Sequence, residues 1–299
     1  ALAQDAYLRA ERLLETLSEA GIESRRVQIE RAGILINRSQ LIGRVESFKE
    51  AVALNDQAGA LLKSVLAEDP NDEDALGTLV IVDLNTASDL RNMGLLDEAL
   101  NRLNRVDDAC NRLRSMSEHP DVYARQQSGA LLTRGNIELD LKLYEQAEQT
   151  LRRRIAFLNT LDDPDPANTL LQLAATRNSL AISLKAQDRF DDAITEYDRC
   201  VSEYRQYFAA TPQASGEQRD REINQLAQTL NNLGIAHGAR EEFAEAEACF
   251  REVVDIRTEL LKRNPTNHYY AASSANTRAS LASVLFQSGR PAESKTELD

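Results

Sequence analysis

The chain carries one pattern of small residues six times along its length. Each copy begins at a residue that is Gly or Ala in five cases of six, namely Leu35, Ala87, Gly135, Ala181, Gly234 and Ala282. Twelve positions later comes Ser47, Ala99, Ala147, Ala193, Ala246 or Ser294, and four positions after that comes Ala51, Leu103, Leu151, Tyr197, Phe250 or Leu298. Two antiparallel helices approach closely where small side chains meet, and a larger residue one turn later fills the gap. The pattern therefore predicts six tandem helix hairpins.

Polar turns and proline-containing links set the predicted helix boundaries. Six of the seven prolines fall in links, and Pro291 falls in a first helical turn, where proline is tolerated. The first helices of the hairpins are predicted over 25–41, 74–92, 122–141, 168–186, 219–239 and 269–287. The second helices are predicted over 45–68, 96–118, 144–160, 190–209, 243–263 and 291–299. The β-branched run 78–82 is assigned to a helix because the repeat phase requires it.

These hairpins predict an all-α fold, an α-solenoid of about six hairpins with an N-terminal capping helix. The lead helix, over residues 3–20, carries Leu13, Leu14 and Leu17 and is expected to cover the open end of the stack. We expect residues 1–23 to form this cap and residues 24–299 to form the repeat domain, with repeats at 24–70, 71–120, 121–166, 167–214, 215–266 and 267–299. Because the last helical pattern stops abruptly, we also expect the chain to be a fragment of a longer protein.

Two repeats resemble the tetratricopeptide repeat (TPR) superfamily. The residues that carry the resemblance are Leu233, Gly234, Ala246 and Phe250 in one repeat and Leu180, Ala181, Ala193 and Tyr197 in the repeat before it. The run 229–233 also resembles repeats of kinesin light chain, and similar long repeats occur in bacterial signalling proteins. The resemblance covers roughly residues 24–299. The signature Trp is absent and the period exceeds the usual ~34 residues, which longer helices would explain.

The resemblance implies a right-handed superhelix whose first helices line a concave groove for an extended peptide or a partner helix. It places the lining one residue after, and three residues before, each small residue. These positions are Ile36 and Ala32, Ser88 and Leu84, Asn136 and Leu132, Ile182 and Asn178, Ile235 and Asn231, and Ser283 and Ala279. The family's carboxylate clamp is not reproduced, because Ile182 and Ile235 stand at one of its two positions. Recognition of a free peptide C-terminus is therefore not expected.

Asparagines recur in or beside this lining, and two cations follow them. The candidate groove residues are Asn85, Arg91, Asn136, Asn178, Lys185, Asn231 and Asn232. An asparagine amide both donates and accepts hydrogen bonds, so a row of them can hold a peptide backbone without reading its sequence. Asparagine is also common on a solvated helix face, which is the alternative interpretation. We expect Asn178 and Asn231 to be exposed and to contribute little to stability.

Charge and hydropathy exclude other partners. The chain has 35 Lys and Arg against 48 Asp and Glu, a net charge of −13, which repels phosphate backbones and predicts no binding to nucleic acid. The longest apolar stretch, near residues 79–82, is far shorter than the ~20 residues that a bilayer requires, so no membrane insertion is expected. Three widely spaced cysteines form no disulfide framework and suit a reducing compartment. We therefore expect a cytoplasmic protein, or an exported or periplasmic one if the first three residues are the remnant of a signal-cleavage site.

No catalytic, metal or cofactor motif is found in the sequence. Nucleophile-elbow, zinc-protease and phosphate-loop patterns are missing. The acidic links 69–74 and 162–165 lack the glycine and final glutamate of a calcium loop, so helix capping explains them better. His237 is expected to be a structural core residue, and Cys200 and Cys249 buried small hydrophobes. We expect no enzymatic activity, no metal and no cofactor.

These observations predict a non-enzymatic scaffold for protein–protein interaction whose groove binds a peptide segment or helix of a partner. One alternative is a peptide-sensing regulatory domain of a larger bacterial signalling protein, attached for example to a kinase or a DNA-binding module. Another is an oligomerisation module in which copies of the chain associate through the last, incomplete hairpin.

Overall fold

The structure is a computed structural model that describes residues 2–19, 24–45, 47–161 and 165–298. Its regular secondary structure over these residues is entirely helical, as the repeat pattern predicts. The helices are α1 (Leu2–Glu19), α2 (Arg25–Val45), α3 (Phe48–Glu68), α4 (Glu73–Asn92), α5 (Leu96–Met116), α6 (Pro120–Asp140), α7 (Tyr144–Leu158), α8 (Pro166–Ala186), α9 (Phe190–Ala210), α10 (Glu217–Ala239), α11 (Phe243–Arg263), α12 (His268–Gln287) and α13 (Pro291–Leu298). None of these helices is long and apolar enough to cross a membrane.

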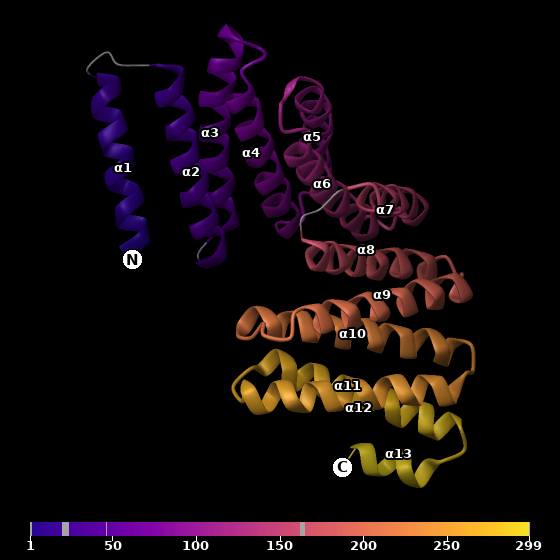
Figure 1. Cartoon of the computed structure of the whole chain (residues 1–299). Coiled ribbons are helices and arrows are strands. Elements are labelled where there is room, and N and C mark those ends of the chain that lie inside the picture. The colour runs from indigo at the N-terminus through magenta and orange to yellow at the C-terminus, as the bar shows by residue number, and fades with distance from the viewer. Residues whose placement is uncertain (1, 20–23, 46, 162–164, 299) are drawn as a thin grey trace. The chain divides into compact units, whose positions relative to one another are not determined.

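The helices fall into two compact units, which we describe separately. The N-terminal unit is Ala1–Lys142 and the C-terminal unit is Leu143–Asp299. Within each unit, every helix packs against the next one in the chain, so the helices stack as sequential hairpins (Figure 1). The boundary between the units falls in the turn between α6 and α7, inside the repeat predicted at 121–166.

The first helices of successive hairpins also touch one another. In the N-terminal unit α4 contacts α2 and α6, and in the C-terminal unit α10 contacts α8 and α12. Within either unit, no second helix makes such a contact with the next second helix in the part of the chain that the structure describes. A stack that is closer on one side than on the other is curved toward that side, so the first helices form the inner face of each unit.

Small residues occupy the tight crossings that the sequence pattern predicts. Ala99, Ala193 and Ala246 are fully buried at the starts of α5, α9 and α11. The closest approach is at Gly234, where an added Cβ would lie 2.9 Å from Cε1 of Phe250. The larger residue one turn later therefore fills the gap beside the small one, as the pattern predicts.

The predicted register of the first repeat is wrong by one helical turn. Ser47, predicted to pack inside the hairpin, instead caps the N-terminus of α3 by accepting a hydrogen bond from the Glu50 amide at 3.3 Å. The buried small pair is Ser39 and Ala51, which have the same twelve-residue spacing. A register shifted by four residues still turns the same face of a helix inward. The correct register was missed because Asn55, four positions after Ala51, is polar where the pattern requires an apolar residue. Asn55 is buried because its Oδ1 accepts a hydrogen bond from the Ser39 hydroxyl at 2.7 Å.

The hairpin turns share one left-handed residue at the same repeat position. It lies seven residues after the small residue and is Gly94, Lys142, Asp188, Glu241 or Gly289, with φ values of 77°, 60°, 59°, 61° and 82°. Glycine adopts this conformation without strain, whereas a residue with a Cβ does not. Three of these five turns therefore carry local strain.

Replacing Glu241 with Gly should stabilise the protein. Relief of the left-handed strain outweighs the greater freedom that glycine gives the unfolded chain, and we expect a gain of about 0.5–1 kcal/mol in the free energy of unfolding. The measurement is urea denaturation of Glu241→Gly beside wild type. Gly289→Ala is the matched control and should lose a similar amount; a gain in that variant would contradict the assignment.

The acidic links act as helix caps. The carboxylates of Asp72 and Asp165 accept hydrogen bonds from the amides of Ala75 at 2.9 Å and Asn168 at 3.2 Å, at the starts of α4 and α8. Pro120 and Pro166, predicted to lie in links, are instead the first residues of α6 and α8, since proline fits the first turn of a helix. Residues 162–164 of the second acidic link lie outside the described residues.

The lead helix packs against α2, but not through all of the predicted residues. Leu14 is half-buried, whereas Leu13 is 66% exposed. The side chain of Leu17 lies outside the described part of the structure. The contact with α2 is consistent with a capping role for α1.

Candidate functional site

A cavity opens on the inner face of the C-terminal unit, between the first helices α10 and α12. Its volume is about 340 Å³. Residues of α10 and α12 form most of its wall, and α11 contributes Phe250. The lining is Gly234, Ile235, Gly238, Ala239, Phe250, Ser280, Ser283, Val284 and Gln287. Ile235 is 41% exposed, so a large apolar side chain borders an opening that water reaches. We call this hollow the apolar cavity.

A second cavity occupies the inner face of the N-terminal unit, between the first helices α2 and α4. Its volume is about 360 Å³. The lining is Ser39, Gln40, Gly43, Phe48, Asn85, Ser88 and Asp89. A carboxylate, two amides and two hydroxyls dominate this list, so we call it the polar cavity.

The two cavities lie at the same place in the repeat. Positions are counted from the small residue of each hairpin, which is Ser39 in the corrected first repeat and Gly234 in the fifth. Gln40 and Ile235 come one residue after it, and Gly43 and Gly238 come four residues after it. On the next first helix, Ser88 corresponds to Ser283 and Asp89 corresponds to Val284. A hollow therefore recurs where a glycine one turn after the small residue leaves space between neighbouring first helices. The surrounding residues make one hollow apolar and the other polar.

Two of the predicted groove asparagines connect neighbouring first helices. Asn178 Oδ1 on α8 lies 3.4 Å from the Thr229 hydroxyl on α10, and Asn231 Oδ1 on α10 lies 3.2 Å from the Thr277 hydroxyl on α12. Both asparagines are half-buried, so the expectation that they are exposed is wrong. The sequence pattern could not show this, because the threonine partners lie about fifty residues away in the next repeat.

Buried arginines on second helices donate hydrogen bonds to threonines at this same repeat position. Arg257 on α11 donates to the Thr277 hydroxyl, and Arg154 on α7 donates to the equivalent Thr176 on α8. Burial lowers the pKa of Arg154 to about 10, since the charged form loses hydration. These contacts tie α7 to α8 and α11 to α12 within the C-terminal unit.

The other predicted groove residues are not gathered in one place. Asn85 lines the polar cavity. Arg91 forms an ion pair with Asp140 on α6 at 2.6 Å, so its charge is engaged within the unit. Lys185 is half-buried on α8, and burial lowers its pKa. Asn136 on α6 and Asn232 on α10 are half-buried.

The candidate reactive residues have structural surroundings. His237 Nδ1 lies 2.7 Å from Glu242 Oε2, which ties the end of α10 to the turn that follows it. Cys200 is fully buried, as predicted, and burial raises the pKa of its thiol to about 12. Cys249 is half-buried, and burial raises the pKa of its thiol to about 11. Thiols with such pKa values are poor nucleophiles near neutral pH.

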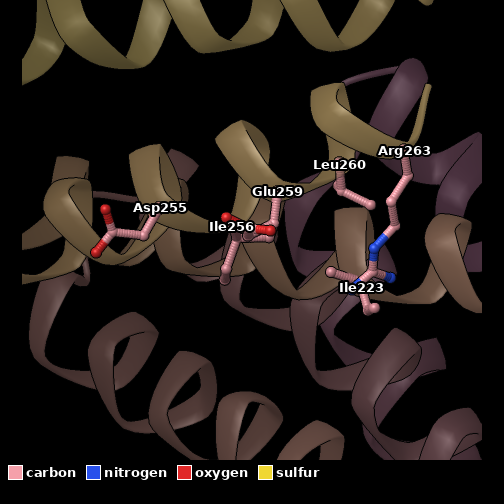
Figure 2. A pocket seen from close by; sticks show the side chains of 6 residues that line it. All are labelled: Ile223, Asp255, Ile256, Glu259, Leu260 and Arg263. Atoms are coloured by element: carbon pink, nitrogen blue, oxygen red, sulfur yellow. The ribbon is translucent and has the colours of Figure 1, made fainter. Parts of the chain in front are cut away.

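A third hollow, of about 270 Å³, lies within one hairpin, between α10 and α11. Ile223, Ile256 and Leu260 form its apolar floor, and Asp255, Glu259 and Arg263 border it (Figure 2). Arg263 is engaged by Asp220 at 3.2 Å. This hollow is not between successive first helices, so we build the candidate site on the other two cavities.

Several cavity residues escaped prediction. Gln40 and Gly43 were hidden by the register slip in the first repeat, which placed the buried Ile36 in the groove instead. Asp89 could have been found by aligning all repeats, because it alone is charged at its repeat position. Three residues of the predicted groove lining do line these cavities: Ser88 the polar one, and Ile235 and Ser283 the apolar one.

Comparison with known proteins finds a matching family for two segments and similar solved structures for most of the chain. Residues 173–209 and 226–268 match the family described as tetratricopeptide repeat. No curated protein matches the chain in sequence. The crystal structure of BtubC (BKLC) from P. vanneervenii is similar with a TM-score of 0.61 at 15% identity, over 84% of this chain and 88% of that one. The apo form of RapI is similar with a TM-score of 0.56 at 13% identity, over 89% of this chain and 94% of that one. Residues 173–209 and 226–268 therefore match the tetratricopeptide repeat family, and the chain shares the fold of these two solved structures.

Proposed function

We propose that the chain is a non-catalytic scaffold whose inner face binds a peptide segment of a partner protein. The observation that carries this proposal is the apolar cavity, which presents the partly exposed Ile235 on the face lined by first helices. Ile235 also stands at the position that the resemblance to other repeat proteins assigns to groove lining. The proposed partner is a protein or peptide, which is what tetratricopeptide repeats typically bind.

The shape of the cavity favours an apolar side chain as the inserted group. Its lining includes Phe250, the aliphatic side chains of Ile235 and Val284, and two glycines. A volume of about 340 Å³ can accept a large aliphatic or aromatic side chain. The serines and Gln287 at the rim supply donors and acceptors for the backbone of the same segment. An extended peptide that places one apolar residue in the cavity fits this arrangement.

A charge at Ile235 should weaken this binding. Dodecapeptides selected from a random display library on the wild-type chain would be synthesised with a fluorophore, and their Kd measured by anisotropy. We expect Ile235→Glu to weaken the selected peptides at least tenfold, about 1.4 kcal/mol, because a carboxylate at the cavity mouth would be desolvated by the inserted side chain. Stability should change by less than about 0.5 kcal/mol, since Ile235 is already partly exposed.

The matched control is Leu143→Glu. Leu143 is 39% exposed, close to the 41% of Ile235, and it belongs to the same unit but not to the cavity lining. At its repeat position the later hairpins carry Arg189, Glu242 and Arg290, so the fold tolerates a charge there. Selected peptides should bind Leu143→Glu as they bind wild type. Equal affinity for Ile235→Glu, or a selection that yields no binder, would refute the proposal.

A further inference from the structure

Asp89, in the polar cavity, stands at a repeat position that is buried and uncharged in the later hairpins. The equivalent residues of the later hairpins are Ile137, Ser183, Ala236 and Val284, all of them buried. An ionised carboxylate at such a position loses hydration, which is costly unless a partner compensates. Its presence therefore calls for a reason other than packing.

The Asp89 carboxylate has no such partner in the part of the chain that the structure describes. No hydrogen bond or ion pair of its side chain is found there, and burial raises its pKa to about 6. Asp83, on the same helix, shows the contrast: it is buried, whereas Asp89 is half-buried, and it lies 3.1 Å from Arg102 and 2.6 Å from Arg105. The helix thus pairs one buried carboxylate with arginines and leaves the other facing the cavity.

A second polar group in the same cavity also lacks a partner. Asn85 Nδ2 is buried and donates no hydrogen bond within the described residues. Asn85 lies one helical turn before Asp89, so the two side chains share a face of α4. A buried donor without an acceptor is destabilising. The cavity therefore presents one unsatisfied acceptor group and one unsatisfied donor side by side.

Gly43 on α2 keeps the space in front of Asp89 open. A Cβ added at Gly43 would lie 3.6 Å from Asp89 Oδ1, which is ordinary contact distance. Any longer side chain at that position would occupy the cavity. The other lining residues, Ser39, Gln40, Phe48 and Ser88, carry no charge that could neutralise the carboxylate.

We propose that the polar cavity binds a primary ammonium group of a partner peptide. Asp89 accepts hydrogen bonds from the ammonium, and Asn85 Nδ2 donates to a carbonyl oxygen next to it. Both an amino terminus and a lysine side chain carry the ammonium, but only the amino terminus has a carbonyl two bonds away, within reach of Asn85. The inference extends the proposed function by naming a chemical group that the inner face recognises, and it concerns a cavity separate from the apolar one.

The test is NMR titration of the whole isotope-labelled chain with small amines. The probes are glycine N-methylamide, which has a free amino terminus and an adjacent carbonyl, Nα-acetyl-lysine N-methylamide, and the neutral control Nα-acetyl-glycine N-methylamide. We expect both amines to shift the Gly43 amide and Asn85 side-chain signals, glycine N-methylamide at the lower concentration, and the neutral control to shift neither. Absence of these shifts with both amines would overturn the proposal.

Variants separate this site from its surroundings. Asp89→Asn should weaken both amines at least tenfold and raise the Tm at pH 7, because the variant no longer desolvates a charge. Asn85→Ala should weaken glycine N-methylamide more than the lysine probe. Asp108→Asn removes an exposed carboxylate of α5 outside the cavity and should change nothing. Unchanged amine affinity in Asp89→Asn would overturn the proposal, while the peptides that depend on Ile235 would still test the proposed function independently.

Discussion

Arg177→Met should cost about 3–5 kcal/mol of unfolding free energy at pH 7, because it leaves two buried carboxylates without their cation. Arg177 on α8 binds Glu196 at 2.6 Å and Glu203 at 2.7 Å, both on α9. All three side chains are largely buried; Arg177 binds Glu203 through Oε1, and Glu203 Oε2 has no hydrogen-bond partner among the described residues. Arg199 reaches only Glu196, at 3.1 Å, so it cannot replace Arg177. Urea denaturation of the variant and wild type measures the difference.

The loss should shrink at lower pH. Burial already raises the pKa of Glu203, and removing Arg177 removes the main influence that lowers it. A carboxyl whose pKa is higher in the folded state than in the unfolded state costs stability as pH rises through that interval. The deficit of Arg177→Met should therefore be largest near pH 7 and smaller near pH 5. A deficit that does not vary with pH would show that packing, and not charge, is responsible.

A triple variant is the matched control. Arg177→Met with Glu196→Gln and Glu203→Gln removes the cation and both charges together while keeping similar volumes. Replacing a whole buried ion cluster with neutral groups is commonly close to neutral in stability. Recovery of most of the loss in the triple variant would assign the effect to the unpaired charges, and no recovery would contradict this account.

The hairpin architecture was predictable because it depends on local features. Small residues at a fixed spacing, such as Ala193 and Ala246, act within a single hairpin, and their spacing can be read directly from the sequence. The error in the first repeat has the same origin. Ser39 and Asn55 bury a polar pair where the other repeats use an apolar residue, so hydrophobicity alone selected a register one turn away.

The candidate site was less predictable because it depends on contacts between repeats. Ile235 lines the apolar cavity and stands at an offset from the small residue that the resemblance alone assigns to the groove lining. The roles of Asn178 and Asn231 depend on threonines of the following repeat, and the openness of the polar cavity depends on Gly43 of the preceding hairpin. Such contacts follow from the offset between hairpins, which no residue pattern within one hairpin specifies.

Phe250→Ala should cost about 3–5 kcal/mol, because it empties the centre of the α10–α11 hairpin. The ring is 1% exposed and lies against Gly234: a Cβ added at Gly234 would meet Cε1 of the ring at 2.9 Å, Cζ at 3.0 Å and the Cβ of Cys249 at 3.2 Å.

Gly234→Ala alone should therefore also destabilise, since overpacking costs roughly 1–3 kcal/mol and outweighs the gain of about 1 kcal/mol in helix propensity. In the Phe250→Ala background the ring is gone, and Gly234→Ala should become stabilising by about 1 kcal/mol. A urea double-mutant cycle measures this reversal of sign, with Gly33→Ala as control because an added Cβ there meets nothing within 4 Å. Additive effects of the two substitutions would mean that Gly234 and Phe250 are not packed against each other. That result would contradict the tight crossing of α10 and α11 at these residues.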